Sequence, residues 1–83
     1  MTEELTKRKY KECSAELLGV LAENIIQLRG VKGLSQEQLA ELSGMHRTFI
    51  SLIERKGRNV TLGAIEALAI ALEVDVPSLL TPK

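Results

Sequence analysis

Apolar residues recur along most of the chain at the spacing of an α-helix. The positions i, i+4, i+8 and i+11 of one helical face are filled by Leu17, Leu21, Ile25 and Leu28. We expect this first helix to begin near Ser14, a suitable N-cap, or further back in the charged KRKYKE stretch, and to end at Gly33. No segment alternates apolar and polar residues between turn-forming clusters, so the pattern predicts helices and no strands.

Capping signals divide the rest of the chain into four shorter helices. Ser35, followed by Gln38 three residues later, has the capping-box pattern, and Gly44 suits the end of that helix. Thr61 and Asp75 are suitable N-caps for a fourth and a fifth helix. The inward side of the second helix is expected to carry Leu39, Ala40 and Leu42. The chain is therefore expected to be all-α, a compact five-helix domain.

Length and composition narrow the possible classes of protein. The 83 residues, 45% of them hydrophobic, are enough for one domain with a modest core. We expect a charged, helical extension at 1–16 and the domain itself at 17–83. One Cys and one His cannot form a disulfide framework or a zinc site unaided. No apolar run approaches the roughly 20 residues that span a bilayer, and no signal peptide is visible. We expect a cytoplasmic protein without cofactor, metal or membrane partner.

The segment from Gln36 to Glu54 has the pattern of a helix-turn-helix. Gly44 permits a sharp corner between two short helices, and the small Ala40 lets the helices approach closely. The second helix is predicted to enter the major groove of double-stranded DNA, where an arginine can bond guanine and a threonine methyl can contact thymine. Its outer face, which we expect to read bases, carries Arg47, Thr48, Ser51 and Leu52. No catalytic motif is present, so we expect no enzyme.

Three runs in this region resemble a known family. They are LSQEQLAELSG at 34–44, ISLIER at 50–55 and RNVTL at 58–62, and they are similar to the Cro/C1-type helix-turn-helix family of phage repressors, which is lambda-repressor-like in fold. The run HRTFIS at 46–51 is most similar to the controller proteins of restriction–modification systems. The resemblance implies a five-helix regulator that binds palindromic operators as a homodimer. One departure is the loop: the family usually reads Arg-Gly-Lys-Arg-Asn, whereas here Gly57 follows Lys56.

Other residues near this helix are candidates for contact with the DNA backbone. His46 is expected to cap the helix or form the turn, with a phosphate contact as the alternative, and Phe49 to support the helix or touch the backbone. Glu54 is expected to pair with a nearby arginine, and direct contact with cytosine is the alternative. The full set of phosphate candidates is Gln36, His46, Phe49, Arg55, Arg58 and Asn59.

The placement of charge supports this interpretation, although the total does not. The chain has 11 basic and 11 acidic residues, so the formal net charge is zero. Between Arg29 and Arg58, however, there are six basic and three acidic residues, a local net charge of +3. We therefore expect DNA to dock against the middle of the chain.

One recognition helix reads only a few base pairs, so we expect a two-fold dimer that spaces two such helices about 34 Å apart. The fifth helix and the end of the fourth are expected to form the interface, from a surplus of apolar residues near the C-terminus that includes Ile70. The interface candidates are Ile65, Leu68, Leu72, Val74, Val76 and Leu79. RNA polymerase is a candidate further partner. The alternative is an antitoxin or adaptor of the same fold whose main partner is another protein.

Overall fold

A computed structural model describes residues 14–57 and 59–83 of the chain. They form five helices and no strand, which confirms the all-α, five-helix expectation. The helices are α2 (Ala15–Lys32), α3 (Gln36–Ser43), α4 (Arg47–Glu54), α5 (Leu62–Leu72) and α6 (Val76–Leu80). The predicted helical extension lies mostly at 1–13, outside the described residues, and the expected boundary after residue 16 falls inside the first turn of α2.

Each helix begins at a residue whose side chain bonds a free N–H of the first turn, as the sequence predicts. The Ser14 hydroxyl accepts from the Leu17 N–H at 3.2 Å, which places the start of α2 at Ala15. The Thr61 hydroxyl caps α5 at 3.0 Å, and the Asp75 carboxylate caps α6 at 3.0 Å. Gly33 ends α2 in the left-handed conformation, with φ 68°.

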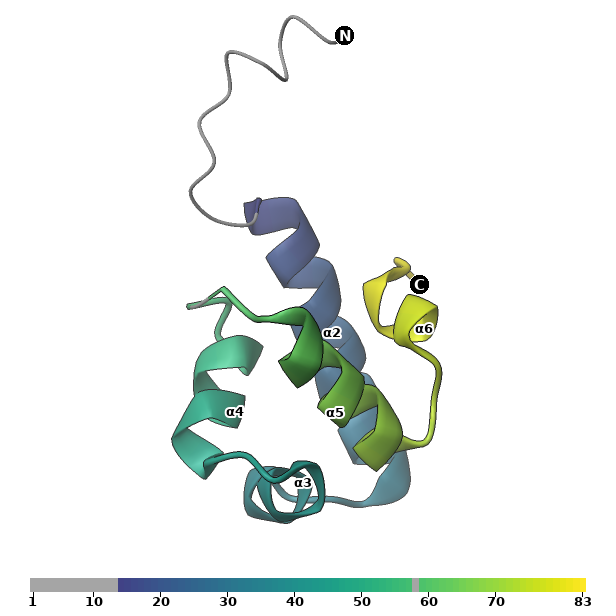
Figure 1. The fold of residues 1–83 in the computed structure, drawn as a ribbon. Coiled ribbons are helices and arrows are strands. Elements are labelled where there is room, and N and C mark those ends of the chain that lie inside the picture. Colours follow the sequence, from purple (N-terminus) through teal and green to yellow (C-terminus); the bar gives the residue numbers. More distant parts are fainter. Residues whose placement is uncertain (1–13, 58) are drawn as a thin grey trace, which may run out of the picture.

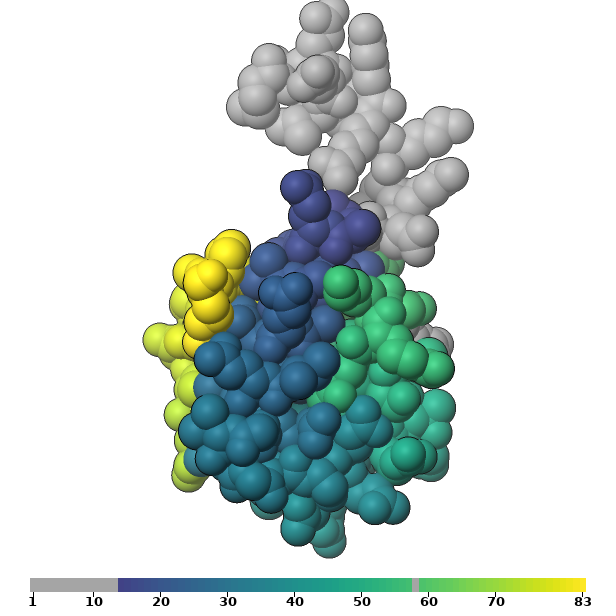
Figure 2. All heavy atoms as spheres, turned by 180° about the vertical axis from the view of Figure 1, so that it is seen from behind, coloured from purple at the N-terminus to yellow at the C-terminus, as the bar shows by residue number. Residues whose placement is uncertain are grey.

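Helix α2 is the centre of the fold, and α4, α5 and α6 pack against it (Figure 1). It contacts α4 on one side and α6 on another, while α3 packs against α4 and α5. Seen from behind, the purple-to-blue surface of α2 lies between the yellow C-terminal segment and the teal and green of α4 and the loop after it (Figure 2). The side chains that close the core at 1% exposure or less include Leu21, Ile25, Leu39, Ile50, Leu68, Leu72 and Leu79.

Asn24 holds the C-terminal helix against α2. Asn24 is 1% exposed, and its side-chain NH₂ group donates to the carbonyl oxygens of Ser78, Leu79 and Thr81 at 3.3, 2.9 and 3.0 Å. These are orphan carbonyls at the end of a helix, which would otherwise need water. No local sequence pattern indicates this role of Asn24, because the bonds span more than 50 positions of the chain.

Two leucines expected to face the core are exposed. Leu17 is 41% exposed near the start of α2, and Leu42 is 59% exposed on α3. Leu42 is two residues beyond the buried Ala40, about 200° round the helix axis, so the two cannot face the same side. The expectation that Leu42 faces inward was therefore wrong.

Candidate nucleic-acid interface

Helices α3 and α4 meet at the corner that the sequence predicts. Ser35 and Gln38 form a reciprocal capping box at the start of α3. Gly44 ends α3 with φ 72°, a conformation that glycine adopts at no steric cost, and the next N–H, of Met45, donates to the Ala40 carbonyl at 2.9 Å. The two helices can pack closely, because Ala40 is small and buried at their junction. This is the geometry of a helix-turn-helix.

The imidazole of His46 caps the second of these helices. Its backbone is extended (φ −82°, ψ 143°), and its Nδ1 accepts the backbone N–H of Thr48 at 3.1 Å. The ring fills the position that a serine or aspartate oxygen usually occupies. The capping role expected for His46 is therefore confirmed, and the ring is exposed.

Helix α4 has one buried side and one outer side. Ile50 and Ile53 are 1% and 2% exposed and fasten the helix to the core. The structure brings the four residues expected to read bases together on α4, but their exposure differs. At the first turn, Arg47 and Thr48 are exposed, whereas further along the helix Ser51 and Leu52 are half-buried.

A buried carboxylate fixes the far end of α4. The side chain of Glu54 is 6% exposed, and Arg29 of α2 donates to its two oxygens from Nε at 2.8 Å and from Nη2 at 3.1 Å. Gln36, the first residue of α3, donates its Nε2 to the same carboxylate at 2.9 Å. The Arg29 Nη1 also donates to the Leu34 carbonyl at 2.9 Å. The arginine pairing expected for Glu54 is confirmed, and one carboxylate connects α2, α3 and α4.

Two ion pairs lower the positive charge expected at the interface. Two of the six basic residues between Arg29 and Arg58 are in ion pairs: Arg29 with Glu54, and Lys32 with Glu73. Among the described residues of that segment, the basic side chains outside these two ion pairs are Arg47, Arg55 and Lys56.

The remaining phosphate candidates differ in their surroundings. Arg55 and Asn59 are exposed beside the end of α4. Phe49 is half-buried and packs against the core, as expected of a support for the helix. The side-chain NH₂ of Gln36 is bonded to Glu54, which limits how it can meet a phosphate. Arg58 lies outside the described residues.

The loop after α4 adapts to its displaced glycine. Lys56, and not Gly57, takes the left-handed conformation, with φ 61°. The Gly57 N–H donates to the Leu52 carbonyl at 2.9 Å and closes the end of α4. The Lys56 side chain runs beside Gly19 of α2, where an added Cβ would lie 3.7 Å from the Lys56 Cε.

Comparison with known proteins identifies the family. A family model described as helix-turn-helix matches residues 25–79, which include α3 and α4 and most of the described domain. The chain belongs to the helix-turn-helix family. This match confirms the resemblance seen in the sequence. The chain is therefore a helix-turn-helix transcription regulator.

Individual members of the helix-turn-helix family are also similar. The control protein C.SmaI of Serratia marcescens is 54% identical over 69 residues, 83% of this chain and 82% of that protein. The crystal structure of the restriction–modification controller protein C.AhdI of Aeromonas hydrophila is 44% identical, with a TM-score of 0.72 over 75% of this chain and 94% of that one. SinR, a master regulator for biofilm formation crystallised in complex with DNA, is 34% identical, with a TM-score of 0.71 over 74% of this chain and 98% of that one.

The dimer residues expected from sequence are mostly inside the helix-turn-helix domain. Four of the six have no surface to offer a partner, because they are between 0% and 7% exposed within a single chain: Ile65, Leu68, Leu72 and Leu79. Val74 and Val76 are half-buried and pack against the core. The expected interface was wrong for those four residues, because apolar periodicity does not distinguish a protomer's core from a contact between protomers.

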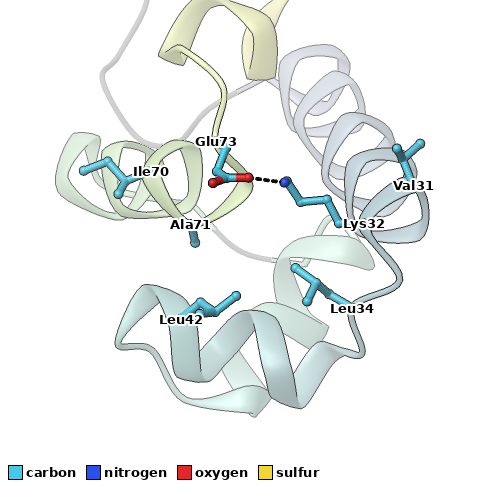
Figure 3. Close-up of a pocket in the computed structure, with 7 residues that line it drawn as sticks. All are labelled: Val31, Lys32, Leu34, Leu42, Ile70, Ala71 and Glu73. Atoms are coloured by element: carbon cyan, nitrogen blue, oxygen red, sulfur yellow. Dashed lines mark hydrogen bonds and ion pairs between the residues drawn. The ribbon is translucent and has the colours of Figure 1, made fainter.

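Other apolar residues are exposed on the helix-turn-helix domain at two places, where the sequence had indicated only Ile70. Leu62, at the start of α5, is 80% exposed beside an apolar hollow of about 160 Å³, which Leu17 and Leu80 also line. At the other end of α5, Leu42, Val31 and Ile70 rim an open groove crossed by the Lys32–Glu73 ion pair (Figure 3). None of the described helices is long and apolar enough to cross a membrane.

Proposed function

We propose that this chain binds double-stranded DNA sequence-specifically as a homodimer on a palindromic operator. The observation that carries the proposal is that Arg47 and Thr48 are exposed at the first turn of α4, on a helix that His46 caps and Glu54 anchors. An arginine at this place can bond guanine O6 and N7 with two hydrogen bonds, and a threonine methyl can contact a thymine methyl. Ser51 and Leu52, which are half-buried further along α4, contribute at the edge of this surface.

Phosphate contacts position the domain on the duplex. We assign them to Arg55, Asn59 and Arg58 after α4, together with the ring of His46 and the edge of Phe49. At the start of α3, free backbone N–H groups beside Gln36 can approach a phosphate, and the helix dipole favours the anion there. Arg55 and Asn59 are exposed in the structure, which supports their part of this assignment.

The dimer interface is best placed at the exposed leucine that begins α5. Leu62 follows the loop after α4, so pairing through it would bring the C-terminal ends of two recognition helices toward the dyad. A second copy would cover the hollow lined by Leu17 and Leu80. Val76, the first residue of α6, and Val74 before it are half-buried and could add only a small area.

The dimer proposal is tested by light scattering at micromolar concentration. Leu62→Asp should give a monomer, because the new charge is buried in the interface, while an acidic residue in the first turn of α5 suits the helix dipole. Ile70→Asp, which changes a side chain 71% exposed at the other end of α5, is the matched control and should remain a dimer. A dimeric Leu62→Asp protein or a monomeric Ile70→Asp protein would show that the interface does not lie at Leu62.

Specificity and symmetry are tested together by selecting bound duplexes from a random pool. We expect a palindrome whose half-sites are about one helical turn apart. A single unpaired half-site would contradict the dimer, and no enrichment would contradict sequence-specific binding.

The biological role follows from these features. We propose that the chain acts in the cytoplasm by binding and not by catalysis, and that it controls transcription in a restriction–modification locus. Its similarity to C.SmaI and C.AhdI supports that role. It could repress by blocking RNA polymerase or activate by touching it. Transcription from a promoter carrying the selected operator, with and without the protein, separates the two.

The groove at the far end of α5 favours a second candidate function, that of an antitoxin or adaptor. On its rim, Val31, Leu42 and Ile70 are 78%, 59% and 71% exposed. Exposed apolar patches often mark protein contacts. Co-purification of a second small protein that is lost on Ile70→Asp, without any duplex enrichment, would favour this function.

A further inference from the structure

The cap of the recognition helix differs chemically from the other caps of the fold. Ser14, Ser35, Thr61 and Asp75 cap their helices with side-chain oxygens. Helix α4 is capped by the His46 ring nitrogen Nδ1, which accepts the Thr48 N–H at 3.1 Å. A hydroxyl oxygen accepts a hydrogen bond at any pH of interest, whereas an imidazole nitrogen accepts one only while it carries no proton.

The hydrogen bond also fixes the tautomer of the ring. Because Nδ1 is the acceptor, the proton of the neutral imidazole is on Nε2. The ring is exposed beside Arg47 and Thr48, the two residues assigned to base reading. Neutral His46 therefore caps the helix with one nitrogen and offers an N–H donor with the other.

Protonation would remove the cap. With a proton on each ring nitrogen, Nδ1–H would face the Thr48 N–H, donor against donor. The added positive charge would also lie at the positive end of the helix dipole. The ring would have to turn away, leaving the first turn of α4 without its side-chain cap.

We propose that His46 is a positioning residue that orders Arg47 and Thr48 for base reading only while its imidazole is neutral, so that acidification lowers sequence discrimination. The proposal rests on the function proposed above. It predicts opposite effects on two kinds of DNA. Affinity for the operator falls as the first turn loosens, whereas affinity for random duplex does not fall, because the charged ring adds a cation near the phosphates.

His46 is the chain's one histidine, and imidazole is the side chain that ordinarily changes charge between pH 5 and 8. In the described residues His46 forms no ion pair, and Arg29 and Lys32 are bonded to Glu54 and Glu73. The other charged side chains on α4 and on the elements packed against it are Arg47 on α4, Glu37 and Glu41 on α3, and Glu16 and Glu23 on α2. Arginines and carboxylates ordinarily keep their charge across this range.

The first test measures binding of the full chain to the selected operator and to a scrambled duplex at pH 8.0 and 5.5, at constant salt. The operator-to-scrambled affinity ratio should fall by about fivefold in the wild type, the effect of losing one N-cap. His46→Ser keeps an oxygen cap that does not titrate, so its ratio should change less than twofold. His46→Ala should show the low ratio at both pH values. An unchanged wild-type ratio, or a parallel fall in His46→Ser, would overturn the proposal.

The second test needs no DNA. In NMR titrations of the free protein, the Thr48 amide should shift with the same midpoint as the His46 ring protons. The Gln38 amide, capped by the Ser35 oxygen at 3.0 Å, is the internal control and should not follow it. If the chemical shift of the Thr48 amide does not follow that of the His46 ring protons, the cap is refuted, even if the protein binds the operator. Absence of operator binding at pH 8.0, with the Thr48 shift present, would instead contradict the proposed function.

Discussion

The two ends of the recognition helix are held in very different ways. At its C-terminal end, Glu54 is 6% exposed and receives three hydrogen bonds, two from Arg29 and one from Gln36. At its N-terminal end, the one side-chain cap is the bond from the Thr48 N–H to the exposed His46 ring. A buried network therefore holds the end remote from the residues proposed to read bases, and one exposed cap holds the end that carries them.

This difference separates two requirements of DNA recognition. The buried network fixes the direction of α4 relative to α2 and α3 before DNA arrives, so orientation need not be gained on binding. The exposed first turn carries Arg47, the residue proposed to read a base edge. Changes at the two ends should accordingly be read out by different measurements, the anchored end by stability and the free end by specificity.

The largest expected effect is at the anchored end. Glu54→Ala leaves Arg29 and Gln36 without their acceptor inside the fold, so we expect a loss of about 3 kcal/mol in the free energy of unfolding. Urea unfolding at fixed protein concentration measures it. Glu73→Gln removes the other ion pair, which is at the surface, and is the matched control with a much smaller loss. Equal losses in the two variants would show that Glu54 is no special anchor.

A change at the free end should affect binding instead. Arg47→Ala removes an exposed side chain, so the free energy of unfolding should be nearly unchanged. Affinity for the operator should fall by about 1–3 kcal/mol, and one position of the half-site should become degenerate. Fluorescence anisotropy on operator and random duplexes measures both. The base-reading role is excluded if random duplex loses as much affinity as the operator.

The sequence predicted what is decided locally. The N-caps at Ser14, Ser35, Thr61 and Asp75 each depend on a bond across three residues, and all four form as expected. The corner at Gly44 was predicted for the same reason. The identity of the family and the exposed position of Arg47 followed from this local pattern.

Features that depend on distant parts of the chain were less accessible. The sequence predicts an arginine partner for Glu54, but no local signal indicates that Arg29 is the partner or that Gln36 shares the carboxylate. The apolar pattern also predicts Leu68 in a dimer interface, although the residue is 0% exposed. An apolar stripe shows which side of a helix is buried, and only the packing shows what buries it.

The loop beside the anchored end offers a smaller change of the opposite sign. Lys56 has φ 61°, which costs a residue with a Cβ about 1 kcal/mol that glycine would not lose. Lys56→Gly should stabilise the fold by about 0.5 kcal/mol, since greater freedom of the unfolded chain offsets part of the gain. Lys56→Ala removes the side chain beside Gly19 without relieving the backbone, so it should not stabilise. Thermal unfolding measures the stability of both variants. Equal gains in stability would show that loss of the Lys56 side chain, and not relief of the backbone, stabilises the fold.

The smallest expected effect comes from the Asp75 carboxylate that caps α6, which we compare with the His46 cap of α4. The hydroxyl and N–H of Ser78 donate to the Asp75 carboxylate and hold its pKa below the usual 3.8. Because the pKa is lowered by folding, this cap stabilises α6 above pH 3.8 and is lost only as the pH falls through the lower, folded value. In an NMR titration the Ser78 amide should therefore move only below pH 3.8, separately from the Thr48 amide. Asp75→Asn keeps an oxygen acceptor and should abolish the Ser78 transition alone. If Ser78 and Thr48 moved together, they would report one global unfolding and not the separate loss of two caps.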